Sequence, residues 1–550
     1  MAENKKYSLG LIGQGFIYQK ISLTAESRYE IISLTAESSF QQLAMCKLIV
    51  YCSDTWSPRT LQEINRRCLQ ANVALLPVYT QFDEGIIGPC VTPRKKGCTS
   101  CAELRKLGAT AFEPDRRLLH HFLLEEHKPV VSQPWLSSFS LETLAALVEE
   151  EIATYLERPD QAHTNCALLY VSLKTLECQK HTFLPFPTCP DCTQPVTDRA
   201  ELAVITLQSQ TKQDVFTYRI RQPAASAEQI LSRYVDERTG LVSSLTVENT
   251  NMLPIASAQL FTESEVTLGT GSTLHPAQSK VVSVLEVVER YAGLRPRSKH
   301  TVVRASYNQL MQQKELALDP TTLGLHSPEQ YEQHGHHHNS RLLIPYHSDL
   351  VFHWVWGYSF QHQAPMLIPE HYAYYGVPVT RENPAFVFEI SNGCALGNCL
   401  EEAIFHGILE VVERDAFLLT WYAQLNLPRL HPYSVTDPTL RLLIEHLEYH
   451  SGYTIHILNA SLDHVIPCLC LLAVDEHERE SMPKAFVAAG SHPHPEQALL
   501  KALREFAMFQ AFPRQLNQQN RTLALKMLED ASLVHKMDHH PLVYYLPEAF

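Results

Sequence analysis

Continuous apolar segments separated by a polar helical pattern mark the first 150 residues. The segments at residues 7–13, 47–54 and 73–79 have the length of buried strands. A helical pattern near residues 61–70 lies between the second and the third. Strands that alternate with helices in this way form parallel sheets with helices on their faces. We therefore predict an α/β arrangement for this part of the chain.

A change of sequence texture between residues 184 and 235 predicts a domain boundary. Proline-containing and polar sequence is followed there by a helical stretch at 226–240. From about residue 240 onward the pattern predicts one large α/β unit. Its expected strands include 386–391 and 465–474, and its long helices are 276–292 and 398–421. We therefore expect two domains, 1–235 and 236–550, which a chain of 550 residues can support.

Composition and charge exclude several classes of function. A content of 45% hydrophobic and 19% charged residues is typical of folded globular proteins. The formal net charge of -14, without a Lys/Arg-rich stripe, argues against a nucleic-acid-binding protein. The sequence contains no apolar stretch of membrane-spanning length and no signal-peptide core. We therefore expect a cytoplasmic protein without a membrane segment.

Four of the fourteen cysteines form two C-x-x-C pairs, Cys98 with Cys101 and Cys189 with Cys192. Four thiolates in tetrahedral array suit a structural zinc ion without an open position. A redox site would need a C-x-x-C at a helix start, whereas both pairs are expected in loops that contain Gly or Pro. The sequence predicts structural zinc, with Cys90 as a competing ligand.

The segment 391–417 carries a helix with clustered acids. Glu401, three residues after Asn398, predicts a capping box at the helix start. Asn398, Glu402, Glu410 and Glu413 fall within an arc of about 120°. Because the intervening residues are almost all apolar, this helix is expected to be buried, and buried like charges need cations. The alternative is that the acids form a solvated face.

A second helix repeats this pattern. Pro276 suits its first turn and Gly293 its end, and Glu286 and Glu289 share one face. Each acidic helix follows a glycine-bearing loop that could donate backbone N–H groups to phosphate. Carboxylate ligands favour hard cations, so the two helices predict a site for a polyphosphate held by Mg²⁺.

The motifs SxxExxERYxG at 283–293 and SNGxAxGNxLEEAxxHGxxExxERDAF at 391–417 resemble the two ATP and magnesium helices of the YcaO superfamily. The resemblance covers about residues 240–550 and implies a YcaO α/β domain. It also implies an ATP-dependent cyclodehydratase that forms azoline rings from Cys, Ser or Thr residues of a precursor peptide, by phosphorylating the backbone amide oxygen. YcaO-type thioamide or amidine formation would use the same ATP site and stays open.

The resemblance assigns roles residue by residue. It implies magnesium ligation by Glu286, Glu289, Glu402, Glu410 and Glu413, and nucleotide contacts by Ser283, Asn398, Arg414 and, more weakly, Ser243 and Ser244. Arg414 and Glu413 are the expected catalytic residues. Azoline-forming members usually end in a proline-rich tail, and this sequence ends at Phe550 without one. This predicts either a truncated chain or altered catalysis.

The N-terminal half is similar to degenerate ThiF-like, Rossmann-related domains, which carry the paired C-x-x-C. Gly10, Gly13 and Gly15 do not match the dinucleotide-binding spacing, so a docking role is expected. No leader-binding module is recognisable in 1–235, so a separate leader-binding protein is expected, together with a dehydrogenase and a homodimeric state. Adenylation by the N-terminal domain and a non-catalytic peptide scaffold are the rival functions.

Overall fold

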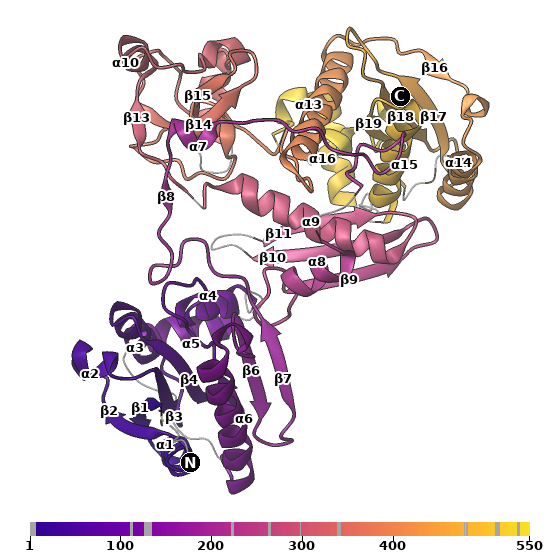
Figure 1. Ribbon diagram of the computed structural model, residues 1–550. Helices are drawn as coiled ribbons and strands as arrows, with labels where there is room; N and C mark the ends of the chain where they lie inside the picture. The colour runs from indigo at the N-terminus through magenta and orange to yellow at the C-terminus, as the bar shows by residue number, and fades with distance from the viewer. Residues whose placement is uncertain are drawn as a thin grey trace. The chain divides into compact units, whose positions relative to one another are not determined.

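The computed structural model describes residues 7–109, 114–125, 135–221, 225–261, 266–297, 299–337, 343–477, 479, 482–511, 518–535 and 539–550. The chain divides into two compact units (Figure 1). Unit 1 comprises Met1–Pro195, Glu228–Leu245 and Ala258–Leu268, and unit 2 comprises Val196–Ala227, Thr246–Ser257 and Gly269–Phe550. Residues 196–227, assigned to the N-terminal domain from the sequence, thus cluster with unit 2.

Unit 1 is built on a seven-stranded sheet of order β2-β1-β3-β4-β5-β6-β7. The strands are β1 Ser8–Gln14, β2 Glu30–Leu34, β3 Leu48–Ser53, β4 Ala74–Gln81, β5 Glu84–Ile87, β6 Ala167–Ser172 and β7 Cys178–Thr182. The first four are parallel and the last three antiparallel. The three predicted strands and the α/β class are confirmed.

Helices cover both faces of this sheet. Helices α1 Phe16–Ala25 and α6 Ser138–Glu157 pack on one face, and α2 Phe40–Ala44, α3 Pro58–Gln70 and α4 Thr99–Ala109 pack on the other. Side chains alternate between the two cores, since Leu48 and Val50 of β3 join the first and Ile49 joins the second. A parallel sheet needs this cover because its strands are apolar on both sides.

Unit 2 contains a four-stranded antiparallel sheet of order β16-β17-β18-β19. Its strands are β16 Arg429–Leu430, β17 Thr454–Asn459, β18 Cys468–Val474 and β19 Ala485–Ser491. Helices α14 Pro438–Ser451 and α15 Pro495–Ala511 pack on one face, and α13 Leu400–Tyr422 packs on the other. Leu469 and Leu471 face α14 and α15, while Cys468 and Cys470 face α13.

Smaller elements complete the fold. Strands β13 Val303–Ala305, β14 Phe352–Ser359 and β15 Ala364–Pro369 form an antiparallel sheet, and β8 Val196–Thr197 pairs with β12 Lys299–His300. Strands β9 Ser244–Asn249, β10 Pro254–Phe261 and β11 Val266–Ser272 form a sheet of order β11-β10-β9, and the division into units runs through them. The other α-helices are α5 Pro114–Glu125, α7 Ala200–Ala203, α8 Ala227–Tyr234, α9 Pro276–Leu294, α10 Tyr307–Gln312, α11 Pro328–His337, α12 Glu370–Ala373, α16 Gln518–Glu529 and α17 His539–Val543.

The predicted long helices correspond to α9 and α13, and the strand expected at 465–474 corresponds to β18. The strand predicted at 386–391 is wrong. Phe386 and Val387 are buried in the core around Phe352 and Trp354, but as irregular chain. A buried irregular segment has the same run of apolar residues in the sequence as a buried strand. Among the described residues, no helix combines the length and apolarity needed to cross a bilayer.

Candidate metal and nucleotide site

The loop before α13 is tied to two acidic helices. Glu289 on α9 accepts a hydrogen bond from the backbone N–H of Leu396 at 2.9 Å. Glu410 on α13 accepts one from the backbone N–H of Gly393 at 3.1 Å. The two glutamates are thereby brought to the same short loop, although they lie far apart in the sequence. Both acidic helices therefore contact this loop, and magnesium binding by their glutamates stays a prediction.

Burial and mutual repulsion raise the proton affinity of these acids. Burial, with the nearby Glu410 and Glu286 carboxylates, raises the pKa of Glu289 to about 7. Burial likewise raises the pKa of Glu410, against the opposing charge of Arg414. Each of these partly buried carboxylates therefore favours protonation or a bound cation over an unpaired negative charge.

Glu413 lies at the free edge of the four-stranded sheet. β19 is the edge strand, and the backbone N–H of Ser491 at its end donates to Glu413 at 2.9 Å. Lys501 on α15 approaches the same carboxylate oxygen at 3.2 Å. An edge strand has backbone N–H groups without a sheet partner, and here a carboxylate accepts one of them. This fixes a buried acid where α13 and α15 meet.

Sequence reasoning missed Glu505 on α15. Burial, with the neighbouring Glu413 carboxylate, raises the pKa of Glu505 to about 7. Its carboxylate accepts a hydrogen bond from the backbone N–H of Ala489 on β19, at 3.5 Å. Glu505 therefore extends the group of partly or fully buried acids to a third helix.

An internal repeat could have identified Glu505. Residues 271–278 and 490–497 share the pattern Gly-Ser-x-x-His-Pro-x-Gln, and each is followed by a glutamate at the same spacing, Glu286 and Glu505. The hydrogen bonds repeat too, because the N–H of Thr270 donates to Glu286 at 2.7 Å as that of Ala489 donates to Glu505. In both copies glycine lets the strand approach the helix: a Cβ on Gly271 would lie 2.3 Å from the Ser279 carbonyl oxygen, and one on Gly490 2.1 Å from that of Ala498.

Glu402 accepts hydrogen bonds from a segment far away in the sequence. Arg219 donates to it at 2.5 Å, the backbone N–H of Ile220 at 3.2 Å, and the Asn398 amide at 3.2 Å. Burial acts to raise the pKa of Glu402, but Arg219 and the backbone donor outweigh it, so the pKa is lowered. Glu402 is therefore ionised and already paired with a cation.

The predicted nucleotide contacts differ in how accessible they are. The Ser283 side chain is fully buried, and its hydroxyl donates to the carbonyl oxygen of Lys280. Arg414 is half-exposed, 3.8 Å from Glu410. Ser243 belongs to unit 1, where its N–H donates to the Gln259 carbonyl oxygen. The Asn398 amide, just before α13, donates to Glu402. The nucleotide roles of these residues stay predictions.

Two sequence predictions about α13 are wrong. The N-cap is Cys399, without a side-chain cap, so the predicted capping box between Asn398 and Glu401 does not form. Glu401 instead accepts from the backbone N–H of Gln208 at 2.7 Å, which satisfies a loop donor.

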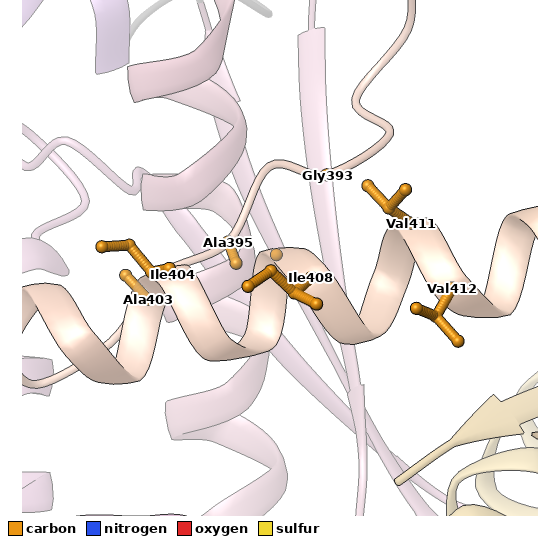
Figure 2. Close-up of a pocket in the computed structure, with 8 residues that line it drawn as sticks. Gly393, Ala395, Ala403, Ile404, Ile408, Val411 and Val412 are labelled. Atoms are coloured by element: carbon orange, nitrogen blue, oxygen red, sulfur yellow. The ribbon is translucent and has the colours of Figure 1, made fainter. Parts of the chain in front are cut away.

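The helix is also not buried on all sides. Glu402 and Glu413 are buried, but Ile408 and Val411 are about half exposed, at 51% and 52%. They line a cavity of about 500 Å³ between α13 and the loop that contains Gly393 and Ala395 (Figure 2). The apolar run therefore combines a core-facing side with an exposed side, and periodicity could not separate the two.

The residues present fit a hard divalent cation. The acids offer carboxylate oxygens, and the raised pKa values of Glu289, Glu410 and Glu505 mark sites where a cation would relieve repulsion. Within the described part of the chain, only the cysteine cluster brings three or more ligand atoms within 4.8 Å of one another. The carboxylates of the glutamates are therefore near one another, but no three of them are close enough to bind one metal ion as they stand.

The four paired cysteines of unit 1 form that compact cluster. The sulfur atoms of Cys98 and Cys189 are 3.6 Å apart, and those of Cys101 and Cys192 are 3.4 Å apart. The cluster suits tetrahedral zinc, and Cys90 is not part of it. One premise was wrong, since Cys98 immediately precedes α4 and Cys101 lies in its first turn instead of in a loop.

An acidic side chain takes the helix N-terminus where Rossmann-type domains bind phosphate. The Asp54 carboxylate accepts the backbone N–H groups of Phe16 at 2.7 Å and Ile17 at 3.0 Å, at the start of α1. Gly15 precedes them with a φ of 100°, and a Cβ there would lie 2.3 Å from Asp54 Oδ2. These donors, which bind pyrophosphate in dinucleotide-binding folds, are already paired with a carboxylate.

Two known proteins are similar to part of this chain. The chain resembles an uncharacterized protein from the tfuA 3′ region of Rhizobium leguminosarum bv. trifolii, with 29% identity over 136 residues, 23% of this chain and 31% of the relative. An uncharacterized protein of Methanothermobacter thermautotrophicus is 31% identical over 122 residues, 22% of this chain and 31% of that protein. The matches thus span about a third of these relatives.

Two solved structures share the fold along nearly the whole chain. A heterocyclase in complex with substrate and cofactor has a TM-score of 0.73 and 21% identity, covering 99% of this chain and 73% of its own. The heterocyclase TruD has a TM-score of 0.64 and 20% identity, covering 100% and 72%. The family model of the YcaO cyclodehydratases, described as ATP- and Mg²⁺-binding, matches residues 270–550. The chain belongs to the YcaO family.

Proposed function

We propose that this chain is an ATP- and Mg²⁺-dependent cyclodehydratase, which converts Cys, Ser or Thr residues of a ribosomal precursor peptide into thiazolines or oxazolines. The observation that carries the proposal is the approach of Glu289 and Glu410, partly buried acids of two helices, to one short loop. Partly buried acids that repel one another are suited to hold a cation–polyphosphate complex. The family description as ATP- and Mg²⁺-binding supports this assignment.

The reaction would begin when the substrate thiol or hydroxyl attacks the preceding amide carbonyl. ATP supplies the phosphoryl group that makes the amide oxygen a leaving group, so that azoline, ADP and phosphate result. The chain's own contribution is positioning and charge neutralisation. The proposed magnesium ligands are Glu286, Glu289, Glu402, Glu410 and Glu413, and we add Glu505 to them. Arg414 would oppose phosphate charge.

Adenylation by unit 1 is the rival enzymatic function, and it would release AMP and pyrophosphate. The Asp54 carboxylate argues against it, because it already accepts the N–H groups of Phe16 and Ile17. A second anion at this helix start would meet like charge. We therefore propose that unit 1, with a zinc ion on its four cysteines, serves docking.

Thioamide or amidine formation by YcaO chemistry would need the same ATP site. A scaffold would bind the peptide without consuming ATP, so nucleotide turnover separates it from each of the enzymatic functions. We further propose that the protein is a cytoplasmic homodimer, and that a leader-binding protein and a dehydrogenase act with it on the precursor peptide.

The nucleotide and peptide products test the proposal together. A precursor peptide with its leader would be incubated with the protein, a leader-binding partner, Mg²⁺ and ATP. We expect peptide-dependent ADP release and the loss of one water from the peptide for each ring. AMP release would favour adenylation. A thioamide would replace one oxygen of the peptide with sulfur without the loss of a water. No use of ATP would indicate a scaffold.

A further inference from the structure

A hairpin formed by residues 211–221 lies against the candidate site within unit 2. The backbone N–H of Arg221 donates to the Thr211 carbonyl oxygen at 2.8 Å, and that of Gln213 donates to the Arg219 carbonyl oxygen at 2.7 Å. Asp214 closes the turn by accepting from the N–H groups of Phe216 and Thr217. The segment therefore has a defined conformation, which we call the 211–221 hairpin.

Aromatic contacts anchor this hairpin on α13 and on the loop after β19. The Tyr218 ring stacks on Phe405 of α13, with centroids 4.5 Å apart and an interplanar angle of 16°. Tyr218 also contacts His492 edge-on at 5.6 Å, and Phe216 contacts His494 in the same way at 5.1 Å. These contacts bring the second strand of the hairpin beside the first turns of α13.

The hairpin binds both oxygens of Glu402. Arg219 donates to Oε1 at 2.5 Å, and the backbone N–H of Ile220 donates to Oε2 at 3.2 Å. The Glu402 side chain is 1% exposed, whereas that of Arg219 is 51% exposed. The carboxylate is thus covered by the hairpin, while the guanidinium can leave toward solvent.

We infer that the 211–221 hairpin is a latch on the metal site: Arg219 takes the cation position at Glu402 and must withdraw before Glu402 can bind Mg²⁺. The inference rests on the proposed function, which makes Glu402 a magnesium ligand. A guanidinium and a divalent cation repel each other, and both would use Oε1 of Glu402, the oxygen to which Arg219 donates. Only molecules with an open latch bind metal at Glu402. The apparent metal affinity is therefore the affinity of the open state multiplied by the fraction of molecules that are open.

The anchoring contacts are weak enough for the latch to open. The ion pair with a half-exposed arginine contributes modestly in water, and so does each of the three aromatic contacts. Tyr218 and Arg219 are therefore expected to set the closed fraction, and the loss of either side chain should favour the open state. In this account Arg219 determines metal affinity without being a magnesium ligand or a catalytic group.

Metal binding by the full-length protein tests the latch without relying on turnover. Mn²⁺ alone would be titrated into the protein, with free Mn²⁺ followed by electron paramagnetic resonance. We expect Arg219→Ala to bind Mn²⁺ about three- to tenfold more tightly than the parent, and Tyr218→Ala to shift affinity the same way. Arg221→Ala, which removes the same charge from the same hairpin, should bind as the parent does. Equal or weaker Mn²⁺ binding by Arg219→Ala would overturn the latch.

Hydrogen exchange provides a second measurement. Addition of Mg²⁺ and ATP should speed exchange at the amides of Ile220 and Arg221, because the first loses its Glu402 acceptor and the hairpin loosens. Unchanged or slower exchange there would overturn the inference. Mn²⁺ binding that does not respond to Arg219→Ala would reject the latch alone, whereas no Mn²⁺ binding by any variant, even with ATP, would reject the magnesium site and the latch with it.

Discussion

The carboxylate of Glu289 on α9 accepts the backbone N–H of Leu396, 107 residues later in the chain, at 2.9 Å. This hydrogen bond joins α9 to the loop before α13, and partial burial raises the pKa of the Glu289 carboxyl to about 7. The structure therefore stabilises the acid in place while disfavouring its free charge.

Glu289→Gln should make folding less sensitive to pH. Glutamine keeps the hydrogen-bond acceptor but does not titrate. The parent carboxyl has an ordinary pKa of 4.5 when unfolded and about 7 when folded, so the parent loses stability relative to the variant as pH rises through that window. The free energy of unfolding of both proteins would be measured with a chelator at about pH 5 and about pH 8. Relative to the parent, the variant should be more stable at the higher pH than at the lower one. An equal difference at both values would contradict the buried environment of Glu289.

The cysteine cluster should hold about one zinc ion per chain. Metal analysis of fresh, reduced protein checks this directly. Cys98→Ser should lose the metal and destabilise unit 1 more than it affects nucleotide binding. Cys178→Ser is the matched control, because Cys178 is exposed and lies outside the cluster. Metal-free parent protein would reject the site.

Asp54→Ala should destabilise unit 1 by about 1 kcal/mol, since it removes a side-chain cap from the start of α1. Peptide-dependent ADP release should be nearly unchanged, because the proposed ATP site lies on other helices. Asp54→Asn, which keeps an acceptor, should lose less stability. A strong fall in ATP turnover with stability preserved would instead favour nucleotide chemistry in unit 1.

Glu505→Gln tests the residue that the internal repeat identifies. The change removes one negative charge near Glu413 while preserving size, so the fold should survive. If Glu505 belongs to the magnesium group, ADP release should fall by about 10²-fold, as for the loss of one electrostatic contact to the phosphoryl group. A parental rate would leave Glu505 as a buried structural acid.

Sequence alone predicted much of the fold and part of the site. The strands around Leu48 and Ala74 followed from continuous apolar runs, because a strand covered by helices on both faces is apolar throughout. Glu402 and Glu413 were placed correctly on a buried side of α13. The exposed side of α13 around Ile408 was not foreseen, since an apolar residue has the same appearance in a core and on a surface.

Contacts between distant segments escaped sequence reasoning. Arg219 reaches Glu402 across 183 residues, and no periodicity links them. Glu505 was overlooked because its helix also carries Lys501 and Arg504, so that one more charged residue there is a weak signal. Its repeat with Glu286 was visible in the sequence. The coil at 386–391 was mistaken for a strand because Phe386 and Val387 are buried without pairing.

Peptide-dependent ADP release by Glu413→Gln tests the central claim most directly. Glu413 is buried where α13 and α15 meet, and glutamine removes only its charge. The exposed Glu445→Gln on α14 is the control for charge loss. We predict parental folding for both variants, a parental rate for Glu445→Gln, and a rate about 10²-fold lower for Glu413→Gln. Release of ADP by Glu413→Gln at the parental rate would contradict the assignment of the site.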